Sequence, residues 1–128
     1  GATHGGIDLA VSKGTPVYAA ANGTVAAIQD GPAFVSSHGY KSCGGNIIYI
    51  HHVVNGVKYT TEYAHLTSYN VKVGDFVTKS TLLGTSGGDQ TTRWYDQCTF
   101  GPHLHYSIGT GWYPGTNYSK STYNKNTY

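Results

Sequence analysis

The chain has 128 residues with a formal net charge of +2, and only 11% of the residues are Asp, Glu, Lys or Arg. This length predicts one domain, residues 1–128, with a core of its own. The Lys and Arg residues form no run, which argues against a nucleic-acid partner. No apolar run reaches the ~18–20 residues of a transmembrane helix, so we expect no membrane partner either.

The composition favours an extracellular all-β protein with many tight turns, because 18 residues are Gly, 12 are Tyr and few are charged. Residues 15–28 contain two apolar runs joined by Asn22-Gly23, which predicts a first β-hairpin. Residues 30–45 are rich in Gly, Ser and Pro without a sustained period, and we expect a long loop there.

A second hairpin is predicted from the apolar run of residues 46–54, the turn Asn55-Gly56 and the alternating run of residues 58–66. Alternation in this last run divides its side chains between the two faces of a strand. One face would carry Tyr59, Thr61, Tyr63 and His65, and the other Thr60, Glu62, Ala64 and Leu66.

Residues 71–77, turned at Gly74-Asp75, and residues 81–84 predict a further hairpin. A second long loop is expected over residues 87–100, directly before the strand that contains His103 and His105. The tail, residues 110–128, shows no period, and we expect it to be loosely structured.

Cys43 and Cys98 lie in the two expected long loops. Neither belongs to a Cys-x-x-Cys pair, and the secreted type of composition favours a disulfide over two buried thiols. Such a bond would tie the two loops together at one end of the sheet, where we expect the active groove.

Two histidines in Gly101-Pro102-His103-Leu104-His105 would point to the same face of a strand, roughly 6.6–6.8 Å apart along the backbone. The chain begins with His4 and Asp8, separated by a Gly5-Gly6 pair that permits a sharp bend. Two imidazoles and a carboxylate are a usual ligand set for a catalytic zinc with an open fourth position. The sequence therefore predicts a metallohydrolase, although each motif alone also arises by chance in a chain with 7 His.

Hydrolysis by a metal site also requires proton carriers and a donor for the oxyanion. Candidates are His65, the adjacent pair His51-His52, and whichever of His103 and His105 is not a ligand. His38 lies in a polar segment and is expected to be solvated.

The order of these motifs resembles the lysostaphin-type zinc endopeptidases over roughly residues 4–108. The matching segments are His4 to Ala10, Thr15 to Val25, Gly45-Asn46 with the strand that follows, Tyr63 to Leu66, Val71 to Val77, Leu83 to Gly87 and Gly101 to His105. The resemblance implies an antiparallel β-sheet or sandwich whose groove is walled by loops.

When the functional residues of this family are matched to positions of this sequence, the resemblance implies that His4, Asp8 and His105 are the ligands of one Zn²⁺. It implies that His65 and His103 are the catalytic pair that does not bind the metal. It places His52 behind the site as a structural residue and leaves His51 unassigned. It implies hydrolysis of stem or cross-bridge peptides of bacterial peptidoglycan by a secreted bacteriolytic enzyme, which we expect to be a monomer.

Some positions depart from the family pattern. The aromatic and acidic residues that usually follow the second histidine are Tyr106 and Ser107 here. Residues 87–100 are longer than the usual short turn, and only three residues precede His4. We therefore expect a reshaped rim and an altered bridge specificity, with Trp94 and Tyr95 either contacting substrate or packing beneath the loop.

Two alternative interpretations of the sequence assign the protein a function other than hydrolysis. A cell-wall-binding relative could keep the fold and lose the chemistry, but such relatives usually lose ligands, and all the expected side chains are present. The Val71 to Val77 segment also resembles lipoyl and biotinyl carrier domains, but Lys58 and Lys79 lack the flanking residues that a carrier lysine shows.

Overall fold

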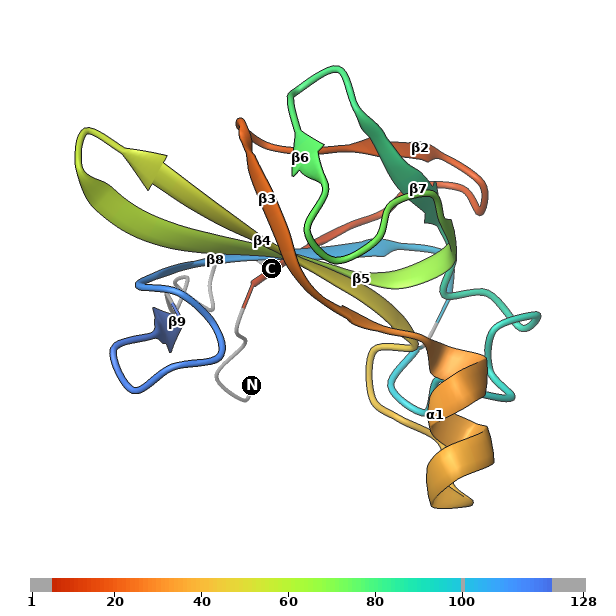
Figure 1. Cartoon of the computed structure of the whole chain (residues 1–128). Coiled ribbons are helices and arrows are strands. Elements are labelled where there is room, and N and C mark those ends of the chain that lie inside the picture. The colour runs from red at the N-terminus through yellow and green to blue at the C-terminus, as the bar shows by residue number, and fades with distance from the viewer. Residues whose placement is uncertain (1–5, 100, 121–128) are drawn as a thin grey trace.

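The computed structural model describes residues 6–99 and 101–120. Figure 1 shows an antiparallel β architecture with a short helix at one end of the sheet. Along the described chain the elements are β1 (Ile7–Leu9), β2 (Pro16–Tyr18), β3 (Gly23–Gln29), α1 (Gly31–His38), β4 (Asn46–Val54), β5 (Val57–Tyr69), β6 (Phe76–Val77), β7 (Leu82–Ser86), β8 (Leu104–Thr110) and β9 (Ser119–Lys120). The predicted all-β class is confirmed.

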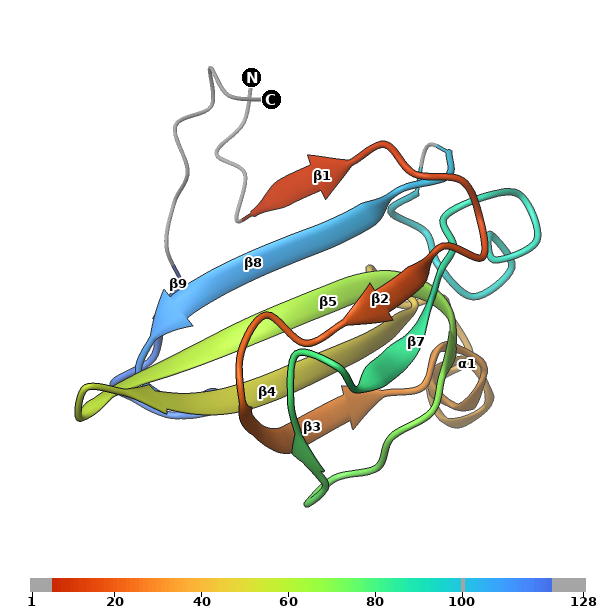
Figure 2. The same cartoon turned by 90° about the horizontal axis from the view of Figure 1, so that it is seen from above.

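The main sheet has the strand order β1-β8-β5-β4-β3-β6, and every pairing between strands is antiparallel. The β2–β7 pair joins it through β5 and lies over one face, as the view from above shows (Figure 2). The hydrophobic core fills the space between these layers. Its buried members are Val17, Ala19, Val25, Ile48, Ile50, Tyr63, Leu66, Val77 and Leu83.

The predicted hairpin between β4 and β5 is confirmed. Val54 and Val57 are Cα partners at its end, and Asn55 and Gly56 both have positive φ, 52° and 77°. Positive φ at both central residues is what a type I′ turn requires, and its twist matches that of the flanking strands.

The other two predicted hairpins are wrong. β2 pairs with β7, and β3 pairs with β4 and β6, so Asn22-Gly23 joins strands that are not partners. β6 and β7 also pair with other strands and not with each other. The turn at Gly74 (φ 96°) is present, but a turn only reverses the direction of the chain and does not select the partner of a strand. For β2 and β3, the partners follow from the burial of Val17 and Val25 in the common core.

The first expected long loop contains helix α1. Asp30 caps it by accepting a hydrogen bond from the Ala33 N–H, and Pro32 lies in its first turn. Gly39 ends it with φ 77°, and the Gly39 N–H donates to the Val35 carbonyl. The capping residues can be recognised in the sequence. The helix was nevertheless not predicted, because it has only 8 residues and almost no amphipathic pattern.

Residues 110–120, expected to be loosely structured, make specific contacts with the sheet. β9 pairs with β8. The Trp112 Nε1–H donates to the His52 carbonyl at 3.0 Å, and Tyr113 stacks on Tyr49. The remainder of the expected tail, residues 121–128, lies outside the described residues.

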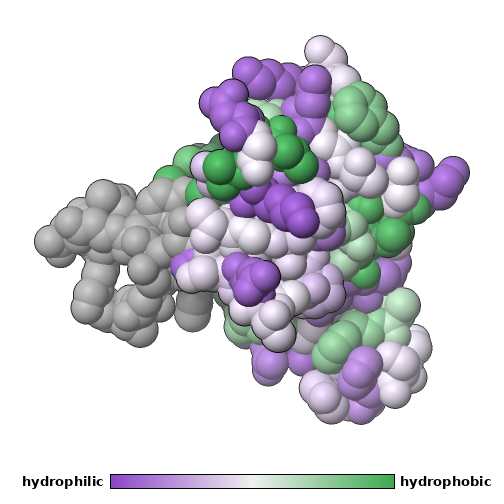
Figure 3. Space-filling view, turned by 60° about the vertical axis from the view of Figure 1, so that its left-hand side comes forward, coloured by the Kyte–Doolittle hydropathy of each residue, from purple (hydrophilic) through white to green (hydrophobic). Residues whose placement is uncertain are grey.

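The surface is mixed in character. Figure 3 shows one face, on which small groups of hydrophobic residues lie among polar ones. Within the described residues, no helix is long and apolar enough to cross a membrane.

We predict that Asp30→Ala lowers the free energy of unfolding by about 1 kcal/mol through loss of the helix cap. Asp30 also accepts a hydrogen bond from the Tyr69 hydroxyl at 2.6 Å. Tyr69→Phe removes only that second interaction and serves as the control. Urea denaturation measures both variants, and equal destabilisation by the two would show that the cap contributes nothing.

Candidate active site

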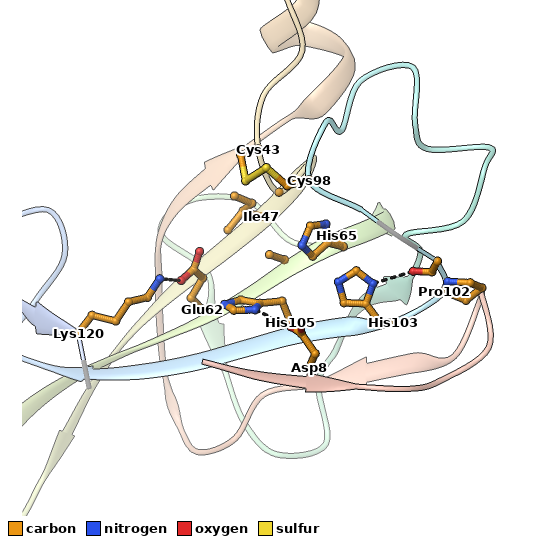
Figure 4. Close-up of a pocket in the computed structure, with 13 residues that line it drawn as sticks. Asp8, Cys43, Ile47, Glu62, His65, Cys98, Pro102, His103, His105 and Lys120 are labelled. Atoms are coloured by element: carbon orange, nitrogen blue, oxygen red, sulfur yellow. Dashed lines mark hydrogen bonds and ion pairs between the residues drawn. A yellow bond between two sulfur atoms is a disulfide. The ribbon is translucent and has the colours of Figure 1, made fainter. Parts of the chain in front are cut away.

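His103 and His105 point to the face of the sheet opposite the core. Leu104 and Tyr106, which alternate with them, pack against the core instead. Both histidines line a pocket of about 520 Å³ on the outer face. The predicted common face of the two imidazoles is therefore confirmed (Figure 4).

Asp8 lies opposite His105 because β1 pairs with β8. The His105 Nδ1 and Asp8 Oδ1 atoms are 2.8 Å apart. Gly6 allows this close approach of the strands, since a Cβ there would lie 2.4 Å from the Tyr106 carbonyl oxygen and 2.7 Å from His105 Nε2. His4, the expected third ligand, lies outside the described residues.

His65 reaches the same pocket through a β-bulge in β5. Ile48 pairs with Tyr63 and Asn46 with Leu66, so two residues of β5, Ala64 and His65, oppose one residue of β4. His65 has φ 63°, a left-handed conformation that is uncommon for residues other than glycine. The predicted alternation placed His65 with Tyr63; the bulge instead brings it to the pocket face with Ala64.

The bulge brings the expected catalytic pair together. The ring centroids of His65 and His103 are 4.3 Å apart, and those of His65 and His105 are 6.2 Å apart. His103 Nδ1 lies 2.7 Å from the Gly101 carbonyl oxygen. Because a carbonyl only accepts, this nitrogen carries the proton and Nε2 of the neutral ring is left as the acceptor.

Asp96 holds His65 from behind. Its Oδ2 lies 2.5 Å from His65 Nδ1, and its side chain is completely buried. Burial by itself would raise the pKa of Asp96, but the hydrogen bond and charge of His65, with backbone N–H donors, lower it below its usual value. Sequence analysis missed Asp96, because no spacing rule connects it to a residue 31 positions earlier.

The pocket also contains the ion pair Lys120–Glu62, with 2.9 Å between Nζ and Oε1. The Ser107 hydroxyl donates to the same carboxylate at 2.7 Å. Burial would raise the pKa of Glu62, but the hydrogen bonds from Lys120 and Ser107 outweigh it and lower the pKa. Glu62 is thus a paired anion at the end of the pocket away from His103 (Figure 4).

The chemistry of Asp8 and His105 fits a divalent cation. Burial lowers the pKa of His105, and the partly opposing hydrogen bond with Asp8 does not reverse this shift, so the ring is neutral at pH 7 as a ligand must be. A carboxylate oxygen and an imidazole nitrogen facing each other are two of the donors that zinc prefers. Within residues 6–99 and 101–120, no group of three or more His, Cys, Asp or Glu could hold a metal.

The predicted disulfide is present between Cys43 and Cys98, and both residues line the pocket rim. It joins the loop before β4 to the loop before β8. The short bridge between Ser42 and Asp96 reinforces this connection.

Trp94 and Tyr95 differ in position. Trp94 is 56% exposed on its loop, outside the pocket lining. Tyr95 is 5% exposed and packs beneath the loop, where a Cβ on Gly31 would lie 2.2 Å from its ring. Of the two expected roles, Tyr95 therefore has the packing role and is too buried to contact substrate in this structure.

The other histidines within the described ranges lie away from the pocket. His52 is buried and bonds to the Asn22 carbonyl oxygen and the Thr61 hydroxyl, as expected of a structural residue. His51 stacks on Trp112 and contacts the Tyr113 carbonyl oxygen at 2.6 Å. His38 is exposed at the end of α1, as predicted.

Comparisons with known proteins agree with this geometry. The sequence model of the family described as Peptidase family M23 matches residues 2–118. Peptidoglycan DD-endopeptidase ShyA of Vibrio cholerae serotype O1 is 35% identical over 107 residues, covering 84% of this chain and 20% of ShyA. Lysostaphin of Staphylococcus simulans is 34% identical over 106 residues, covering 83% of this chain and 18% of lysostaphin.

A solved structure shows the same architecture. The catalytic domain of the antimicrobial peptidase lysostaphin from Staphylococcus simulans has a TM-score of 0.63 and 30% identity, covering 91% of this chain and 74% of that one. The chain spans about a fifth of the length of the curated relatives that it matches.

We predict that Asp96 makes stability depend on acid pH. Because its pKa is lower in the folded than in the unfolded state, its contribution is fully present above about pH 5 and is lost as pH falls below ~4 through the folded-state pKa. Urea denaturation of the wild type and Asp96→Asn, from pH 6 downward, should show a wild-type advantage that shrinks with acid. The other carboxylates are common to both proteins and cancel, so an advantage independent of pH would contradict this assignment.

Proposed function

The chain belongs to peptidase family M23, and we propose that it is a zinc-dependent endopeptidase that hydrolyses peptide bonds in the stem or cross-bridge peptides of bacterial peptidoglycan. The observation that carries this proposal is the pocket itself, where the Asp8–His105 donor pair lies beside the His65–His103 pair. ShyA is a peptidoglycan DD-endopeptidase and lysostaphin is an antimicrobial peptidase, and these relatives support the substrate class.

His4, Asp8 and His105 would hold one Zn²⁺. When bound, a zinc ion polarises the scissile carbonyl and lowers the pKa of a coordinated water. Asp8 and His105 are held in register by the β1–β8 pairing, so two of the three donors lie on adjacent strands of a rigid sheet.

His65 and His103 would carry the proton transfers. In each ring the Nδ1 faces an oxygen acceptor, Asp96 for His65 and the Gly101 carbonyl for His103. Nε2 of each neutral ring can therefore accept a proton from the attacking water. One of the two rings would take this proton; its Nε2–H would donate a hydrogen bond to the developing oxyanion, and the proton would then pass from Nε2 to the leaving amine.

We place the substrate across the pocket as an extended peptide. The Lys120–Glu62 pair bounds one end, and Gly101 and Pro102 lie beside His103 at the other. Trp94, exposed on the neighbouring loop, is a proposed contact at the rim. The disulfide is typical of an exported protein, and we propose that the enzyme is secreted, monomeric and bacteriolytic at the cell wall.

We predict that Asp8→Ala abolishes both zinc binding and hydrolysis, whereas His103→Ala keeps the zinc and lowers hydrolysis about 100-fold or more. The reason is that Asp8 is a proposed ligand and His103 a proposed proton carrier. Metal analysis of the purified variants and a peptide-release assay measure the two effects. Equal zinc loss in both variants would show that the ligand assignment is wrong.

The substrate class is tested by digesting purified cell walls that differ in their bridge peptides, with mass analysis of the released fragments. We expect peptide fragments with newly formed amino termini, and their complete loss after treatment with a chelator. Wall binding without any release would identify the non-catalytic wall-binding alternative. The fragment masses also identify which bond is cut.

A further inference from the structure

A buried carboxylate makes a direct contact with a histidine of the pocket. Asp96 is 1% exposed and comes from the loop between β7 and β8. Its Oδ2 lies 2.5 Å from His65 Nδ1. An ionised carboxylate can only accept hydrogen bonds, so His65 Nδ1 carries the proton and Nε2 is unprotonated in the neutral ring.

The second carboxylate oxygen is also fixed. Asp96 Oδ1 accepts hydrogen bonds from the Gly44 N–H at 3.1 Å and the Cys98 N–H at 3.0 Å. Together with His65, these donors outweigh the effect of burial and lower the Asp96 pKa, so the side chain is an anion at neutral pH. The carboxylate therefore cannot turn without losing hydrogen bonds inside the protein.

Gly44 connects the carboxylate to the backbone of His65. The His65 N–H donates to the Gly44 carbonyl at 2.8 Å, while the Gly44 N–H donates to Asp96. Both the main chain and the ring of His65 are thus held by a closed set of contacts. These contacts stabilise a backbone conformation, φ 63°, that is unfavourable for a residue with a Cβ and persists only where the surrounding structure holds it.

The disulfide stabilises this arrangement covalently. Cys43 directly precedes Gly44, and Cys98, whose N–H donates to Asp96, is bonded to Cys43. Gly45 adds the necessary space, since a Cβ there would lie 3.1 Å from Asp96 Oδ2. The loop segments around the carboxylate are therefore linked to each other as well as to His65.

We propose that Asp96 is a positioning residue that fixes the tautomer and ring orientation of His65, an inference that rests on the proposed catalytic role of His65. In the reaction a proton passes from water to His65 Nε2, while the Nδ1 proton stays on the ring and faces Asp96. The carboxylate then stabilises the imidazolium until Nε2 returns the proton to the leaving amine. His103 has a neutral carbonyl behind it instead, so the two histidines are not equivalent.

The first test is a spectroscopic measurement on the zinc-loaded protein. Nitrogen NMR of labelled histidines at about pH 8.5, where histidine side chains are ordinarily neutral, should show His65 protonated at Nδ1 alone. In Asp96→Asn, whose carboxamide both donates and accepts, the Nε2-protonated form should appear. An Nε2-protonated His65 in the wild type would overturn the proposal without any variant, as would an unchanged tautomer in folded Asp96→Asn.

The second test is a double-mutant cycle on hydrolysis. Asp96→Asn should lower kcat about 10–100-fold with little change in KM or zinc content. In a His65→Ala background the same change should cause no further loss, because Asp96 acts through His65. Independent, multiplying losses would mean that Asp96 has only a structural role and would overturn the proposal.

Asp89→Asn is the matched control. Asp89 lies in the same loop, where it bonds to Thr91, and it does not line the pocket. We expect the kcat and the His65 tautomer of Asp89→Asn to equal those of the wild type. If Asp89→Asn lowered kcat as much as Asp96→Asn does, the specific positioning role of Asp96 would be overturned. If the wild type hydrolyses no wall peptide, the proposed function fails, while the NMR result still decides whether Asp96 positions His65.

Discussion

The left-handed conformation of His65 is the constraint on which the pocket depends. A regular β5 would turn this side chain toward the core with Tyr63, away from His103 and His105. The bulge at Ala64-His65 reverses that direction, and the Gly44 carbonyl holds the His65 main chain in the conformation that the bulge needs. The pocket therefore contains a third imidazole because one residue of the strand is out of regular register.

The site combines a rigid half and a half assembled from loops. Asp8 and His105 lie on adjacent paired strands, and His103 directly precedes β8 and bridges to Gly87, so backbone pairing determines their separation. His65 depends also on loops before β4 and before β8, which the Cys43–Cys98 bond joins. In this division the proposed metal donors Asp8 and His105 lie on paired strands, whereas the proposed proton carrier His65 depends on contacts from loop residues.

Burial has opposite consequences for the ionisable groups around the pocket. His105 loses solvent and remains neutral, which suits a metal ligand. Asp96 and Glu62 are also buried, yet hydrogen-bond donors keep both ionised. The charge state of each group therefore follows from its particular partners and not from burial alone, and these partners come from distant parts of the chain.

The sequence by itself determined the β class, the β4–β5 hairpin, the disulfide and the shared face of His103 and His105, because turn signals, cysteine placement and two-residue alternation are local properties. Only the tertiary structure decided the partners of β2, β3, β6 and β7. It also decided to which face of the sheet the His65 side chain points, and that Asp96 contacts the His65 ring. Strand partners depend on which faces bury a common core, and a bulge depends on the register of two strands at once. A contact 31 positions apart likewise exists only after the loops have packed.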